Sequence, residues 1–150
     1  MAMELRYKAR NNKMKKKKIL IVSAEYYSEI SITMENNAID CLKKLKNFSI
    51  DDPRNNLKNV PGVFEIPVTI AKNIKKYDGF IALGCVIKGE TPHFDFISKS
   101  TTDALMRLSI ENKKPIGNGV ITCLNKNQAE IRSKKKGKEA AEAVISVLSQ

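Results

Sequence analysis

The chain has 150 residues, of which 42% are hydrophobic, and a formal net charge of +11. This length is most simply one domain with a real core. The absence of any run of ~18 apolar residues argues against a transmembrane helix. Three widely spaced cysteines in apolar surroundings indicate buried thiols in a reducing, cytoplasmic setting, not a disulfide framework. Because a single histidine cannot build a usual zinc site, we expect no metal.

The positive charge is concentrated at the N-terminus. Residues 1–18 hold eight cations against Glu4, a net +7, so the rest of the chain carries only +4. We interpret residues 1–14 as a disordered basic leader that precedes a single domain at 15–150. The alternative is weak, salt-sensitive binding to polyanions, without a specific nucleic-acid partner.

Residues 17–25 (KKILIVSAE) read as a buried strand of a parallel sheet. Residues 30–48 follow with apolar positions at helical spacing. The polar segment 49–60 contains Pro53, so it is at most a short or edge strand.

The second half continues the alternation. Residues 61–76 open with a Pro-Gly turn and are predicted to be helical from about Pro67. A strong strand follows at 77–87, and then a long helix at 91–113 with Thr91 as N-cap and Pro92 as its first residue. The chain ends with a strand at 114–124 and a helix at 125–150, with a candidate break near Gly137. This order predicts an α/β fold, with a mostly parallel sheet and helices on both faces.

Chemically capable residues follow the predicted strands. In a parallel sheet, ligands bind beyond the carboxyl ends of the strands. Tyr26, Tyr27, Phe64 and Glu65 could there form an apolar wall and a hydrogen-bonding carboxylate for a heteroaromatic ring, although ordinary aromatic packing is the common alternative. Glu65 interrupts an apolar stretch, so its charge needs a partner or a ligand.

The stretch LGCVIKGETPHFDF (83–96) joins the central strand to the long helix. Gly89, Thr91 and the helix N-terminus form a candidate anion cradle that Lys88 could supplement, although any capped helix looks similar. His93 is the candidate proton-transfer residue, with a capping or surface role as the alternative.

A second candidate anion site lies on the closing helix. Arg132 and Lys136 are spaced i,i+4, so their like charges repel unless an anion binds between them. The alternative is a solvated basic face. The chain has no GxGxxG, GxxxxGK[ST] or GxSxG motif, which removes the fingerprints of Rossmann, P-loop and α/β-hydrolase sites.

Three segments, PGVFEIP, ALGCVIKGETPHFDF and PIGNGVITCLNKNQAEIR, together resemble the lumazine synthase family of riboflavin biosynthesis, over roughly Lys17 to the C-terminus. The resemblance implies a flavodoxin-like three-layer α/β/α sandwich and a transferase without a cofactor. That enzyme condenses 5-amino-6-(D-ribitylamino)uracil with 3,4-dihydroxy-2-butanone 4-phosphate to give 6,7-dimethyl-8-ribityllumazine, phosphate and water. It also implies homopentamers with active sites between subunits; in some members twelve pentamers form a 60-subunit shell, and the sequence leaves both states open.

The matching motifs imply residue roles. His93 matches the family's proton-transfer residue, and Arg132 its phosphate-binding arginine. The residues matched to ribitylaminouracil binding are Tyr26, Val63, Phe64, Glu65, Cys85, Val86, Ile87 and Asn118. Glu90 and Thr91 match the stretch that contacts the butanone phosphate.

The chain also departs from the family pattern. SAEYY stands where an Arg-Phe-Asn-like stretch is usual, which leaves open whether Tyr26 or Tyr27 stacks on the ring. Lys88 replaces a common arginine. The turn after Arg132 is about four residues shorter than in many members, so a phosphate contact by Lys136 and shell formation both stay open. Two other functions remain as alternatives: a Schiff-base aldolase with Lys88 as nucleophile, and a non-catalytic basic binding or assembly protein.

Overall fold

The computed structural model describes residues 17–45 and 56–150. Within these ranges, four parallel strands form one sheet in the order β2-β1-β3-β4. They are β1 (Ile19–Ala24), β2 (Leu57–Val60), β3 (Gly79–Ile87) and β4 (Ile116–Cys123). The predicted leader at residues 1–14 and the surroundings of Pro53 lie outside the described residues. The second strand is short and lies at the edge of the sheet, as expected.

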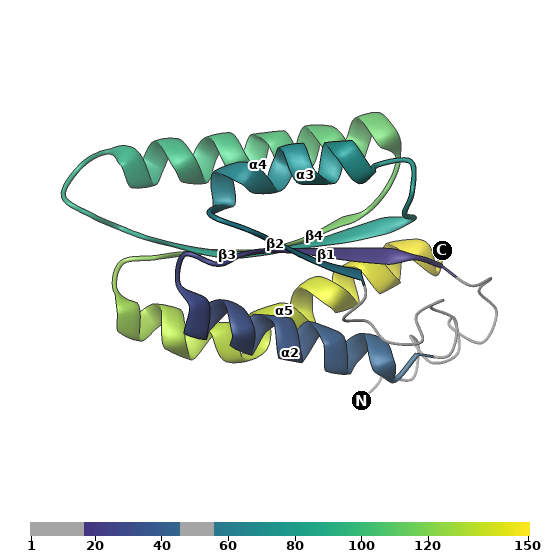
Figure 1. The fold of residues 1–150 in the computed structure, drawn as a ribbon, viewed down its shortest axis with the longest axis horizontal. Helices are drawn as coiled ribbons and strands as arrows, with labels where there is room; N and C mark the ends of the chain where they lie inside the picture. The colour runs from purple at the N-terminus through teal and green to yellow at the C-terminus, as the bar shows by residue number, and fades with distance from the viewer. Residues whose placement is uncertain (1–16, 46–55) are drawn as a thin grey trace.

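Helices cover both faces of the sheet, which makes three layers (Figure 1). α2 (Ser28–Lys43) and α5 (Lys126–Leu148) lie on one face. The 3₁₀ turn η2 (Val63–Glu65), α3 (Ile66–Asn73) and α4 (His93–Asn112) lie on the other. The expected three-layer α/β/α arrangement is therefore confirmed, and in the part described no helix combines the length and apolarity needed to cross a bilayer.

The two sides of the sheet bury separate apolar clusters. In β1, Ile19 and Ile21 face α2 and α5, whereas Leu20 and Val22 face α3 and α4. Every residue of β1 is buried, so the sheet is covered on both faces at this strand. This explains why the strand is a continuous apolar run instead of an alternating one.

α5 is one continuous helix through Gly137, so the candidate break there is wrong. A Cβ at position 137 would lie 2.1 Å from the carbonyl oxygen of Met34 in α2. Glycine at 137 therefore permits a close approach of the two helices. The glycine that was expected to break the helix is instead the point where α5 packs against α2.

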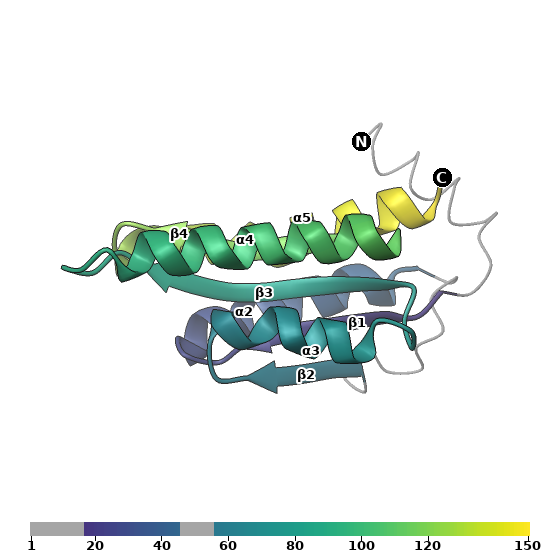
Figure 2. The same cartoon turned by 90° about the horizontal axis from the view of Figure 1, so that it is seen from above.

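The parallel strands bring the turns that follow them to one edge of the sheet (Figure 2). The β1–α2 turn, the η2 turn and the β3–α4 turn all lie there. The edge is tied by backbone bonds that Glu25 N donates to Val60 O (2.8 Å) and Lys88 N donates to Cys123 O (2.8 Å).

Candidate functional site

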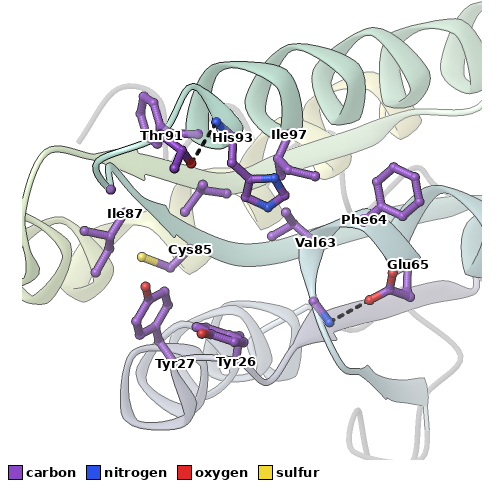
Figure 3. A pocket seen from close by; sticks show the side chains of 14 residues that line it. Tyr26, Tyr27, Val63, Phe64, Glu65, Cys85, Ile87, Thr91, His93 and Ile97 are labelled. Carbon is purple, nitrogen blue, oxygen red and sulfur yellow. Dashed lines mark hydrogen bonds between the residues drawn. The ribbon is translucent and has the colours of Figure 1, made fainter.

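A cavity of ≈ 650 Å³ opens at the carboxyl edge of the sheet (Figure 3). Its size suits a small organic ligand. The lining comes from the end of β3, from the three turns named above and from the start of α4. The lining residues are Tyr26, Tyr27, Gly62, Val63, Phe64, Glu65, Cys85, Val86, Ile87, Gly89, Thr91, His93, Phe94 and Ile97.

Two tyrosines after β1 form one wall. Their ring centroids lie 4.9 Å apart at an interplanar angle of 80°, an edge-to-face pair. Tyr26 is 77% exposed, and Tyr27 is half-buried. Burial, and then the proximity of Tyr26 and Cys85, raises the pKa of the Tyr27 hydroxyl, which therefore stays protonated at neutral pH. Both rings line the cavity, so which of them stacks on a ligand stays a prediction.

The η2 turn supplies the second wall. Phe64 is exposed and Val63 is buried against the sheet. Glu65 Oε1 accepts a hydrogen bond from Gly62 N at 3.0 Å. The backbone of its own turn thus supplies part of the hydrogen bonding that the charged carboxylate needs. This bond holds the carboxylate at the cavity in a fixed orientation (Figure 3).

β3 forms the floor with Cys85, Val86 and Ile87. The η2 turn can approach this strand because residue 84 is glycine. A Cβ there would lie 2.5 Å from Val63 Cγ1 and 3.3 Å from the Ala24 Cβ. Gly84 therefore sets how closely the second wall approaches the floor.

α4 brings His93 to the cavity from the side opposite the tyrosines (Figure 3). The helix begins at His93 with Pro92 as its N-cap, so the prediction of Thr91 as N-cap is off by one residue. The reason is local: Thr91 Oγ1 accepts only a long 3.4 Å bond from His93 N, and the Pro92 carbonyl accepts the first helical bonds, from Asp95 and Phe96. Thr91 and Gly89 still line the cavity, next to the first turn of α4.

Three of the predicted residues do not line this cavity: Glu90, Asn118 and Arg132. Glu90 is exposed in the β3–α4 turn. Asn118 lies on the edge strand β4, where its Oδ1 accepts from Val120 N at 3.1 Å. Arg132 lies on α5 and donates from Nη1 to the Thr122 carbonyl at 2.8 Å. One copy of the chain therefore brings together most of the predicted site and leaves the β4–α5 residues apart from it.

The cavity includes residues that the sequence analysis did not select. Phe94 and Ile97 face it from the first turn of α4, and Gly62 faces it from the η2 turn. The i,i+4 spacing of His93 and Ile97 places both on one helical face. That spacing is the signal that could have found Ile97.

The basic residues outside the cavity have other partners. Lys136 Nζ lies 4.0 Å from Glu139, which offsets the predicted repulsion from Arg132. A second hollow between α2 and α5 mixes Lys44, Lys134 and Lys135 with Asp40 and Glu142, so it is not a uniformly positive groove. Lys88 does not line the active cavity. Among the residues described, no group of three or more His, Cys, Asp or Glu side chains could hold a metal ion.

The chain is similar to known proteins over most of its length. Residues 16–150 match the family model described as 6,7-dimethyl-8-ribityllumazine synthase. The chain is 40% identical over 142 residues to a protein of that name from Bartonella tribocorum, covering 90% of each. It is 38% identical over 142 residues to 6,7-dimethyl-8-ribityllumazine synthase 1 of Rhodopseudomonas palustris, covering 87% of this chain and 83% of that one. It is 36% identical over 148 residues to the Agrobacterium fabrum protein, covering 90% of this chain and 95% of that one.

Proposed function

The chain belongs to the 6,7-dimethyl-8-ribityllumazine synthase family, and we propose that the cavity at the carboxyl edge of its sheet is where the reaction takes place. The activity is the penultimate step of riboflavin biosynthesis. It condenses 5-amino-6-(D-ribitylamino)uracil with 3,4-dihydroxy-2-butanone 4-phosphate. The observation that carries the site assignment is the meeting of Glu65, the aromatic wall and His93 around one cavity.

The cavity walls suit the pyrimidine substrate. Tyr26 and Phe64 offer flat apolar surfaces for the ring, and Cys85, Val86 and Ile87 form the floor beneath it. Glu65 accepts from Gly62 with one oxygen, which leaves the other to accept a hydrogen bond from the ring or the ribityl chain. Holding two substrates side by side supplies proximity, the larger part of catalysis in a condensation of this kind.

His93 is the group for proton transfer. In the reaction, the ring amine attacks the ketone of the butanone phosphate, and water is lost to give a Schiff base. Phosphate is then eliminated, and the ribitylamino nitrogen attacks the remaining carbonyl carbon and closes the second ring with loss of a second water. Protons must leave the amine and reach the departing oxygens. An imidazole can both accept and donate protons near pH 7. Thr91 and the N–H groups at the start of α4 would stabilise the phosphate as it leaves.

Two of the predicted residues outside the cavity, Asn118 and Arg132, suggest that a neighbouring copy completes the site. Arg132 and Asn118 lie on α5 and β4, at the far edge of the sheet from β2. In a ring of identical copies, each interface joins one surface of a chain to a different surface of its neighbour. The β4 edge of one chain can therefore meet the cavity of the next. We therefore assign Arg132 and Glu90 to the phosphate-bearing substrate and Asn118 to the pyrimidine, with Arg132 and Asn118 contributed from the adjacent chain.

The surface of α4 supports such an assembly. Phe96, Met106 and Ile110 are 68%, 59% and 67% exposed. Apolar side chains exposed in this number on one helix are typical of a contact surface. A homopentamer is the state that we propose, with residues 15–150 as its single domain and the cytoplasm as its location, where the three free thiols would stay reduced.

The test is to mix the purified chain with both substrates and follow the visible absorbance and green fluorescence of a lumazine product. The signal should depend on both substrates. His93→Ala should lower turnover by about tenfold or more while substrate binding survives. Full turnover in that variant would remove His93 from the mechanism, and no product from the folded wild-type oligomer would refute the site assignment.

A further inference from the structure

Arg132 is held in place by two acceptors at the end of β4. Its Nη1 donates to the carbonyl oxygen of Thr122 at 2.8 Å and to the Sγ of Cys123 at 3.6 Å. The guanidinium is exposed, whereas Cys123 is 1% exposed. The side chain of an exposed residue is therefore hydrogen-bonded to a buried one.

Cys123 also contacts the cavity floor. Cys85 pairs with Ile121 and Ile87 pairs with Cys123 in the β3–β4 register, so the two cysteines are diagonal neighbours on one face of the sheet. Burial, followed by the proximity of Cys123 and its hydrogen bond, raises the pKa of the Cys85 thiol to about 12. Cys85 is thus a neutral thiol at pH 7 that lies beside Cys123. Cys123 therefore lies between Arg132, whose Nη1 donates to its sulfur, and the floor of the cavity.

We propose that Cys123 is a positioning residue that fixes the plane of the Arg132 guanidinium for the phosphate of the second substrate. With the Thr122 carbonyl alone as acceptor, the guanidinium could rotate about that single hydrogen bond. A second acceptor on the same nitrogen restricts this rotation and orients Nε and Nη2 for another ligand. Two parallel N–H donors on one side of a guanidinium match a phosphate only when their plane is fixed. The proposal rests on the assignment of Arg132 to the phosphate.

The first experiment compares Cys123→Ala with the wild type. The KM for 3,4-dihydroxy-2-butanone 4-phosphate should rise by about three- to tenfold, the range expected for loss of one ordinary hydrogen bond. The KM for the pyrimidine should stay within about twofold, since Cys123 itself does not line the cavity and every lining residue is kept. Inorganic phosphate, titrated calorimetrically against the oligomer, should bind more weakly by the same factor. This binding measurement does not need turnover, so it separates a failure of the proposal from a failure of the proposed reaction.

Two variants control for loss of the thiol. Cys123→Ser keeps an acceptor and should restore most of the phosphate affinity. Cys41→Ala removes a partly buried thiol on α2, outside the cavity, and should leave both KM values unchanged. An equal rise of both KM values in Cys123→Ala would indicate general damage to the fold and overturn the proposal.

A double-mutant cycle with Arg132→Ala gives the deciding result. If Cys123 acts through Arg132, removing the thiol has no further effect on phosphate affinity once the guanidinium is gone. If Cys123→Ala weakens phosphate binding equally in both backgrounds, the residue acts by another route and the proposal is wrong. Unchanged phosphate affinity in Cys123→Ala alone would overturn it as well.

Discussion

The two helical layers of this molecule differ in how completely they are packed within one chain. In α5, seven residues are buried: Ala129, Ser133, Gly137, Ala140, Ala141, Val144 and Ile145. In α4, which is almost as long, only Thr101 and Leu105 are buried. The α2–α5 layer therefore buries many of its side chains within one chain. The α3–α4 layer, which carries His93, presents apolar side chains that one copy leaves uncovered.

The site therefore lies against the less completely packed layer. A cavity persists only where the elements around it are not packed tightly against each other. α4 buries only two residues, so it leaves space between itself and the end of β3. The same helix offers the surface on which a neighbouring copy would sit. Packing on the α2–α5 side keeps the sheet rigid while the other side provides the site.

The largest expected effect is at the α2–α5 contact. Gly137→Val would force a side chain against the Met34 carbonyl, where a Cβ alone would lie at 2.1 Å. The free energy of unfolding should fall by roughly 3 kcal/mol or more, measured by urea denaturation. Gly89→Ala is the matched control, because a Cβ there meets nothing within 4 Å. Equal losses in the two variants would contradict the idea that the α2–α5 layer depends on close approach.

The equivalent glycine on the other side of the sheet is Gly84. A methyl group there would collide with Val63 Cγ1 and displace the η2 turn. We expect Gly84→Ala to raise the KM for the pyrimidine by about tenfold and to lower the free energy of unfolding by only about 1–2 kcal/mol. Steady-state kinetics and urea melts test both parts. A large loss of stability without any change in KM would show that this side serves the core more than the site.

The exposed faces of the two layers provide a third test. Ile110→Lys on α4 should reduce the oligomer mass, measured by light scattering after size exclusion, because it places a charge in the proposed contact. Ile32→Lys on α2 is the control, since Ile32 is 53% exposed on the other layer. A mass that falls equally in both variants would mean that the layers do not differ as interfaces.

The smallest expected effect is on the pH dependence of stability, and it comes from the Cys41 thiol on the α2–α5 side. Burial, above any charge, raises the pKa of Cys41 from an ordinary value of 9.0 to about 11. The folded state then holds this proton more tightly than the unfolded chain. The resulting stabilisation is complete below pH 9 and declines as the pH rises toward 11.

Urea melts between pH 8 and pH 11 should therefore show a shallower decline in Cys41→Ala than in the wild type. The difference between the two slopes isolates this thiol from the lysines and tyrosines that titrate in the same range. Identical slopes would show that the Cys41 thiol titrates as it does in the unfolded chain.

The alternation of strands and helices could be predicted from the residues alone, because the apolar run that begins at Ile19 and the helical spacing on α2 and α5 reflect burial that any such fold requires. It also indicated the cavity residues after β1, β3 and the Pro-Gly turn, since parallel strands must end at one edge. The resemblance to the family motifs added the predicted roles of His93 in proton transfer and of Arg132 in phosphate binding. Local rules failed at Thr91 and at Gly137, where helix geometry and a neighbouring helix decided the outcome.

Which of these residues meet depends on how the whole chain packs. Glu65 proved to be held by Gly62, Ile97 joined the cavity, and Asn118 and Arg132 lay apart from it, because side-chain contacts depend on strand order and on how closely the elements pack. The bond from Arg132 to Cys123 links α5 to the end of β4, and no spacing in the sequence predicts it. Distances between segments far apart in the chain are set by the packing of the whole core, and a local pattern carries no information about them.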